Sequence, residues 1–167
     1  MLNKEKIASF NESYLATHKQ NLNFLGENLS KKNLDLNNVI NKLSNFQIAI
    51  PSWALGTGGT RFGRFPLGGE PNTLEEKIKD VGLLHALNRS SGAISLHIPW
   101  DIPEDYKKMK SLAHELDINF DAVNSNTFQD QSGGTHSYKF GSLSHIDKAI
   151  RKKAIQHNKE VIDHGIK

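Results

Sequence analysis

The sequence predicts an α/β fold in which parallel strands alternate with helices. Strand-like runs lie at 46–50, 93–98 and 118–124, and each is followed, after a loop, by a segment whose apolar residues recur at helical spacing. Such alternation favours parallel strands joined by right-handed crossover helices. The length of 167 residues is enough for one domain that buries roughly 70% of its unfolded surface.

The composition argues against several classes of function. A formal charge of +3, from 21 basic and 18 acidic residues, is too small a surplus to steer nucleic acid. The chain has no cysteine, so a bound metal would need oxygen or imidazole ligands. No run approaches the ~20 apolar residues that span a bilayer, and no apolar signal segment follows the N-terminus. We therefore expect a cytoplasmic protein with no membrane partner and no nucleic-acid partner.

Residues 1–45 are predicted to form a helical N-terminal extension. Their apolar residues fall into two groups with spacings of three and four, which indicates two amphipathic helices. Ser30 is a candidate cap for the second of these helices. Because the segment carries no chemical motif, we expect its role to be structural.

Residues 46–167 contain the three predicted strand–helix units. The segment 56–72 has six Gly and two Pro, too many for regular structure, and is expected to be a loop. Thr73 and the Glu three residues later form a capping box at the start of the first helix. Asp101 is a candidate N-cap for the second helix, and Ser144 is expected to open the third.

The spacing of these elements favours one architecture over another. Long loops follow the strands and short connections follow the helices, as in one half of a barrel, and the phosphate fingerprint of a Rossmann fold is missing. The predicted fold class is therefore a partial (β/α)8 TIM barrel of about three βα units. Three strands do not close a barrel, which in the usual geometry needs eight.

Candidate functional residues follow all three predicted strands. Trp53 follows the first strand, His97 closes the second, and Asn124, Ser125 and Asn126 follow the third. In a parallel α/β fold these positions meet at one edge of the sheet. An indole, an imidazole and amides suit a small polyhydroxylated ligand, since aromatic faces pack on C–H surfaces and polar groups bind hydroxyls. The pattern predicts a sugar site.

Two further features allow more than one interpretation. Asp101 is spaced four residues from His97, so its carboxylate could orient the imidazole, but its place before Pro103 equally suits an N-cap. The alternating Arg and Phe of 61–65 suggest a flap over a site, or a subunit-contact loop. A phosphate-binding P-loop is rejected, because no Gly-Lys-Ser/Thr opens into a helix. No HExxH motif is present.

Five runs are specific enough to compare with a known family. They are Ile50–Trp53 (IPSW), Gly59–Phe62 (GTRF), Leu96–Asp101 (LHIPWD), Asn124–Asp130 (NSNTFQD) and Lys139–His145 (KFGSLSH). In this order and spacing they resemble the broad-specificity bacterial L-rhamnose isomerases, over about residues 46–165.

The resemblance implies a (β/α)8 barrel, usually tetrameric, that interconverts an aldose and its ketose between C1 and C2 with two divalent ions, typically manganese. By this resemblance His97 contacts the sugar and assists ring opening or positioning, while Trp53 and Phe128 line the pocket. Phe62 would reach the site of a neighbouring subunit. The family's metal ligands come from later strands, so no metal ligand is expected in this chain.

These observations lead to two hypotheses of different classes. The first is that the chain is a fragment of such an isomerase, inactive alone, whose small-molecule partner is an aldose or ketose and which forms a homo-oligomer. The alternative is a non-catalytic sugar-binding or assembly module, for which aromatic residues at the strand ends suffice. Sugar binding without metal would favour the alternative.

Overall fold

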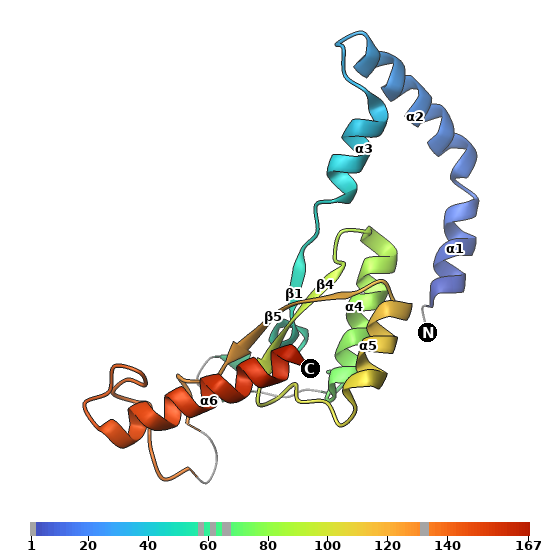
Figure 1. Ribbon diagram of the computed structural model, residues 1–167. Helices are drawn as coiled ribbons and strands as arrows, with labels where there is room; N and C mark the ends of the chain where they lie inside the picture. Colours follow the sequence, from blue (N-terminus) through green and yellow to red (C-terminus); the bar gives the residue numbers. More distant parts are fainter. Residues whose placement is uncertain (1–2, 57–58, 61–62, 65–67, 131–133) are drawn as a thin grey trace.

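The computed structural model describes residues 3–56, 59–60, 63–64, 68–130 and 134–167. It is a mixed α/β structure in which short helices precede three strand–helix units (Figure 1). In chain order the elements are α1 (Lys4–Glu12), α2 (Leu15–Ser30), α3 (Leu36–Ser44), β1 (Ala49–Pro51), the 3-10 helix η1 (Ser52–Leu55), β2 (Gly59–Thr60), β3 (Gly63–Arg64), α4 (Leu74–Asn88), β4 (Ala93–Ile98), α5 (Tyr106–Glu115), β5 (Asn119–Ser125) and α6 (Lys148–Ile166).

The three predicted strands form one parallel sheet in the order β1-β4-β5. The central strand, β4, is buried from Ile94 to Ile98, as expected for a strand with neighbours on both sides. In the register, Pro51 lies opposite Ser95, and His97 lies opposite Asn124. The parallel α/β prediction is confirmed, whereas closure into a TIM barrel stays a prediction. The segment 56–72 was expected to be irregular, but its described part includes the short antiparallel pair β2–β3.

The hydrophobic core lies between the sheet and the helices α4 and α5. These two helices run side by side in Figure 1 and contact each other. Gly82 of α4 allows this approach, because a Cβ built there would lie 2.9 Å from Leu116 Cδ1. Helix α6 runs along β5 instead. The core side chains are Leu74, Ile78, Val81, Ile94, Leu96, Met109, Ala113 and Ile118.

The N-terminal segment contains three helices rather than the two predicted. Helix α1 contacts α4, and its one buried residue is Ile7. Helices α2 and α3 pack on each other and project away from the sheet (Figure 1). All residues of α2 and α3 are described, and none of them is buried. The extra break lies at Ser13 and Tyr14, between α1 and α2. The 1–45 boundary of the extension stays a prediction.

Three of the expected helix caps are wrong, and in each of these three helices an Asp is the N-cap instead. Asp35, Asp105 and Asp147 have extended backbone, and each side chain accepts a hydrogen bond from a backbone N–H in the first turn of α3, α5 or α6. That geometry defines an N-cap. Ser30 instead ends α2, and Asp101 lies five residues before Tyr106, where α5 begins. Ser144 likewise precedes the start of α6.

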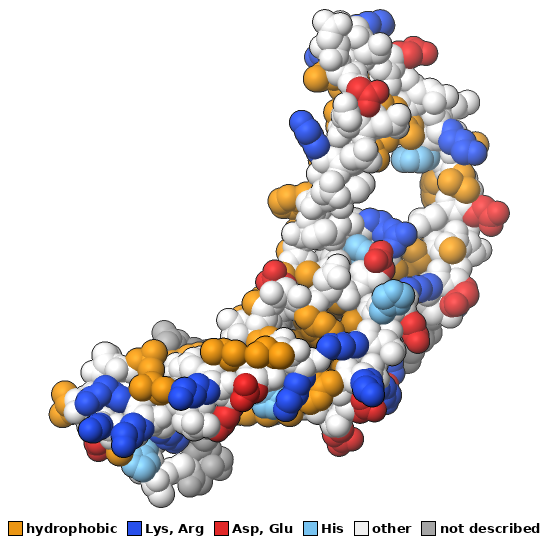
Figure 2. All heavy atoms as spheres, viewed as in Figure 1, with side chains coloured by type: hydrophobic (Ala, Val, Ile, Leu, Met, Phe, Trp, Pro, Cys, Tyr) orange, Lys and Arg blue, Asp and Glu red, His pale blue; other side chains and the backbone are white. Residues whose placement is uncertain are grey.

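The chain exposes more surface than a compact domain of its mass. Its accessible area is 11944 Å² for 18.7 kDa, whereas a compact monomer of that mass exposes about 8,300 Å². Figure 2 shows hydrophobic side chains open to solvent over α6 and the N-terminal helices. The exposed apolar residues of these helices include Phe24 and Ile166. Among the described residues, no helix is both long and apolar enough to cross a membrane.

The predicted capping box at the start of α4 is confirmed and gives a stability prediction. Thr73 Oγ1 accepts a hydrogen bond from the Glu76 N–H at 3.2 Å, and the Glu76 carboxylate accepts one from the Thr73 N–H at 3.0 Å. We expect Thr73→Ala to lower the free energy of unfolding by about 1 kcal/mol, measured by urea denaturation. Thr17→Ala, inside the exposed helix α2, is the matched control and should cause no loss. An equal loss in both variants would contradict a capping role.

Candidate functional site

Four aromatic rings from three segments of the chain meet at the C-terminal end of the sheet. The imidazole of His97, at the end of β4, has its ring centroid 5.2 Å from that of Trp53 in η1, which directly follows β1. Its centroid lies 4.8 Å from that of Trp100 and 5.7 Å from that of Phe128, in the loop after β5. We call Trp53, His97, Trp100 and Phe128 the ring cluster.

The rings of the ring cluster differ in their exposure to solvent. His97 is 9% exposed, whereas Trp53, Trp100 and Phe128 are 50%, 45% and 46% exposed. The imidazole therefore lies at the base of the cluster, and three half-open aromatic rings surround it. The sequence places the residues there because β1 and β4 are parallel neighbours whose chains turn away just past Pro51 and Ile98. Such a surface can pack on C–H groups while its base binds a polar group.

The His97 ring has one nitrogen without a partner. Its Nε2 is buried and makes no hydrogen bond within the described chain. The pKa of His97 is lowered, mainly because burial penalises the charged form; the charges of His157 and Lys77 act in the same direction, whereas Asp101 and a hydrogen bond to the Ser125 backbone oppose them. The neutral imidazole is thus favoured. A neutral ring with one nitrogen protonated can accept a hydrogen bond at the other.

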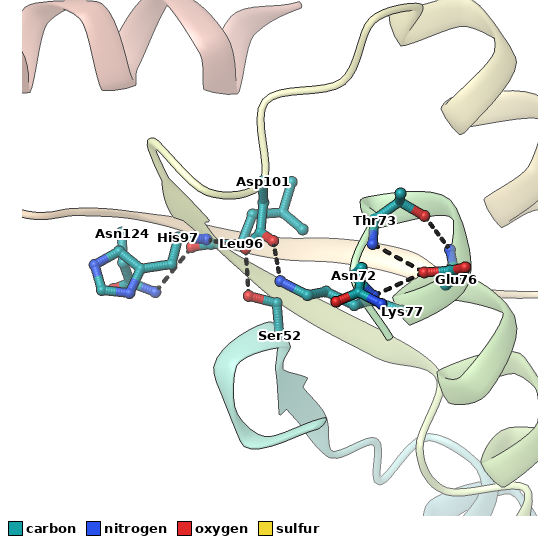
Figure 3. Close-up of polar contacts among 9 residues, drawn as sticks. All are labelled: Ser52, Asn72, Thr73, Glu76, Lys77, Leu96, His97, Asp101 and Asn124. Carbon is teal, nitrogen blue, oxygen red and sulfur yellow. Dashed lines mark hydrogen bonds and ion pairs between the residues drawn. The ribbon is translucent and has the colours of Figure 1, made fainter. Parts of the chain in front are cut away.

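Asp101 is neither an N-cap nor a partner of the imidazole ring. Its buried carboxylate accepts a hydrogen bond from Lys77 Nζ at 2.6 Å, one from the backbone N–H of His97 at 2.7 Å, and a close one from the Ser52 hydroxyl. Figure 3 shows the His97 ring directed away from this carboxylate. Both interpretations of Asp101 from the sequence are therefore wrong. Its two side-chain partners come from α4 and η1, far away in the chain.

The polar residues at the end of β5 and just after it hydrogen-bond within the protein rather than at the rings. Asn124 Nδ2 donates to the Leu96 carbonyl at 3.3 Å (Figure 3), and the Ser125 hydroxyl donates to Asn158 at 2.8 Å. Asn126 is buried and bonds Gln129 in its own loop. The expected amide contribution to a sugar site is not found in these contacts.

Of the residues assigned by resemblance, the structure brings Trp53, His97 and Phe128 together. Phe62 lies outside the described residues. Trp100 was not assigned any role from the sequence, although it belongs to the quoted run Leu96–Asp101. It joins the cluster because the Asp101 N–H donates to the His97 carbonyl at 3.0 Å and closes the turn between them. The functional roles of these residues stay predictions.

A metal ion would need a different set of donors from those seen here. Within the described part of the chain, no three His, Asp or Glu side chains are grouped as they would be around a metal ion. The carboxylate of Asp101, which accepts from the His97 N–H, is also engaged by Lys77 and Ser52. The residues described do not fit a metal centre.

The chain is similar to proteins described as sugar isomerases. It is 48% identical over 141 residues to the "Probable sugar isomerase" of Rhizobium meliloti (strain 1021), a match that covers 84% of this chain and 33% of that protein. It is 45% identical over 141 residues to a protein of the same description from Mesorhizobium japonicum, with the same coverage. The chain therefore spans about a third of the length of the curated relatives it matches. No family model matches the chain.

The lowered pKa of His97 predicts how stability depends on pH. The unfolded chain, with a histidine pKa of about 6.5, binds this proton before the folded chain does. The contribution of His97 is therefore fully present above that pH and is lost as the pH falls through the folded pKa. We expect His97→Gln to show a shallower loss of unfolding free energy below pH ~6.5, measured by urea denaturation across pH. An imidazole that titrates above the ordinary value in an NMR titration would contradict this.

Proposed function

We propose that this chain carries part of the sugar-binding site of an aldose–ketose isomerase. The observation that supports it most is the half-open ring cluster around a buried imidazole whose Nε2 has no partner within the described chain. The similarity to two proteins described as sugar isomerases points to the same class. Together they favour an isomerase site over an unrelated aromatic surface.

The chain's residues have distinct roles in this proposal. The faces of Trp53, Trp100 and Phe128 pack on the C–H surfaces of the sugar and exclude water from one side of it. His97 Nε2 accepts a hydrogen bond from a sugar hydroxyl, which requires the neutral imidazole that burial favours. A proton released as the sugar ring opens would be taken up at the same nitrogen.

The finer assignments rest on the resemblance to L-rhamnose isomerases. It favours L-rhamnose and L-rhamnulose as the sugars and a divalent ion, manganese, as the cofactor that polarises the sugar oxygens. It also favours a TIM barrel and a homo-oligomer, in which this chain supplies one part of the site. The rest of the barrel or another subunit would cover the exposed apolar side chains of α6 and the N-terminal helices.

Calorimetric titration tests the binding step directly. We expect the purified chain to bind L-rhamnose saturably, and His97→Phe, which keeps a ring but loses both nitrogens, to bind it more weakly. Galactitol, an acyclic polyol, is the matched ligand control. No saturable heat with any aldose or ketose would contradict the proposal.

A chimera tests the isomerase step. The 141 residues of the Rhizobium meliloti protein that match this chain are replaced by their counterpart here, and aldose–ketose interconversion is followed in the presence of manganese. We expect the chimera to isomerise the sugar that its parent isomerises, and the same chimera with His97→Phe to lose most of this activity. Sugar binding by the chain without isomerisation by chimera or parent would instead support a non-catalytic sugar-binding module.

A further inference from the structure

The Asp101 carboxylate connects the two segments that carry the closest rings of the site. Ser52, immediately before Trp53, and the backbone N–H of His97 both donate to its Oδ2. Lys77 donates to the other oxygen, Oδ1. Figure 3 shows Ser52 and Lys77 reaching the carboxylate from two different segments. One buried group therefore contacts η1, the end of β4 and helix α4 at once.

We propose that Ser52 and Asp101 are positioning residues that set the distance between the Trp53 indole and the His97 imidazole. Neither side chain belongs to the ring cluster, so each acts through the residue next to it or bonded to it. This inference deepens the proposed function. It rests on that function in one respect, that the ring cluster binds a sugar. Its physical content is the 5.2 Å separation of the two ring centroids.

Backbone pairing ends before it reaches the rings. Strand β1 is three residues long, and its ladder with β4 stops at Pro51 opposite Ser95. Trp53 and His97 each lie two residues beyond that last pair. Beyond that pair, among the described residues, the two segments are linked through Asp101, which accepts hydrogen bonds from the Ser52 hydroxyl and the His97 N–H.

The chemistry of this link suits a fixed distance. Hydrogen bonds to an ionised carboxylate are shorter and roughly twice as strong as neutral ones. Asp101 and Ser52 are each 1% exposed, so water does not compete with these bonds. Lys77 compensates the carboxylate charge from α4, and its side chain is 8% exposed. Side chains whose partners are all satisfied in this way hold one arrangement rather than several.

The test measures ring contacts by NMR in Ser52→Ala, without any sugar. Ser95→Ala is the matched control, because Ser95 is a similarly buried serine on β4 whose hydroxyl donates to Asp121 at 3.0 Å. We expect Ser52→Ala to lose most of the nuclear Overhauser intensity between the Trp53 indole and the His97 ring. The contact of His97 with Trp100 should remain, because the Asp101 N–H to His97 carbonyl bond still closes their turn. Ser95→Ala should keep both contacts.

Three outcomes would overturn the proposal. The first is an unchanged Trp53–His97 contact in Ser52→Ala, and the second is an equal loss in Ser95→Ala. The third is loss of the far-UV circular dichroism of the fold in Ser52→Ala, because the hydroxyl would then hold the fold rather than two rings. Since no sugar enters the measurement, a chain that fails to bind sugar leaves this result unaffected.

Discussion

Lys77→Met is expected to lower the free energy of unfolding by about 3–5 kcal/mol. The side chains of Lys77 and Asp101 are 8% and 0% exposed, and Nζ lies 2.6 Å from Oδ1. Removal of the ammonium leaves a buried carboxylate without its compensating charge, which is costly because the site is closed to water. Methionine has a similar length and is apolar, so it fills most of the space. Urea denaturation followed by circular dichroism measures the loss.

Two comparisons separate burial from charge. Lys108→Met removes a cation 2.6 Å from Glu75 at the exposed surface, and this variant should lose much less stability. The double variant Lys77→Met with Asp101→Asn removes both buried charges and should recover part of the loss. If Lys77→Met lowered the free energy of unfolding no more than Lys108→Met, the buried Lys77–Asp101 ion pair would not stabilise the fold as described.

Trp53→Ala is expected to weaken sugar binding about tenfold, which corresponds to roughly 1.4 kcal/mol. The substitution removes an aromatic face that is half open to solvent and that packs on His97. It should affect affinity more than stability, because a half-exposed side chain contributes less to the core than a buried one. Calorimetry with L-rhamnose measures the affinity, and thermal unfolding of the same sample measures stability.

Two variants control for the Trp53 result. Trp53→Phe keeps an aromatic face and should retain most of the affinity. Phe140→Ala removes a ring that is 78% exposed and outside the ring cluster, and it should leave the affinity unchanged. A loss of affinity in Phe140→Ala as large as in Trp53→Ala would show that binding is not located at the ring cluster.

The elements that the sequence predicted well are those with local signals. The strand at 93–98 and the capping box at Thr73 depend on neighbouring residues, and both are confirmed. The local pattern that predicted an N-cap at Asp101 was misleading. The Asp101 carboxylate instead bonds Lys77 and Ser52, which lie 24 and 49 positions away in the sequence. Once Asp101 is engaged there, Asp105 takes the cap of α5. A local pattern cannot reveal that competition.

The candidate site also has parts that the sequence could predict and parts that it could not. The meeting of Trp53 and His97 could be predicted, because the C-terminal ends of parallel strands share one edge of a sheet. Phe128 was placed with them only by the family resemblance. The part played by Trp100 could not, since it depends on a turn held by the Asp101 backbone. The amides of Asn124 and Asn126 have the right chemistry for hydroxyls, but they bond to the Leu96 carbonyl and to Gln129 instead. Residue type alone does not show which partner a polar group takes.

An NMR titration of the chain with L-rhamnose tests the central claim most directly, because it reports which side chains the sugar touches. The account predicts that the ring signals of Trp53, His97 and Trp100 shift together and saturate at one sugar concentration, while those of Phe140 stay in place. Shifts confined to other parts of the chain, or no saturable shift at any of the three rings, would contradict it.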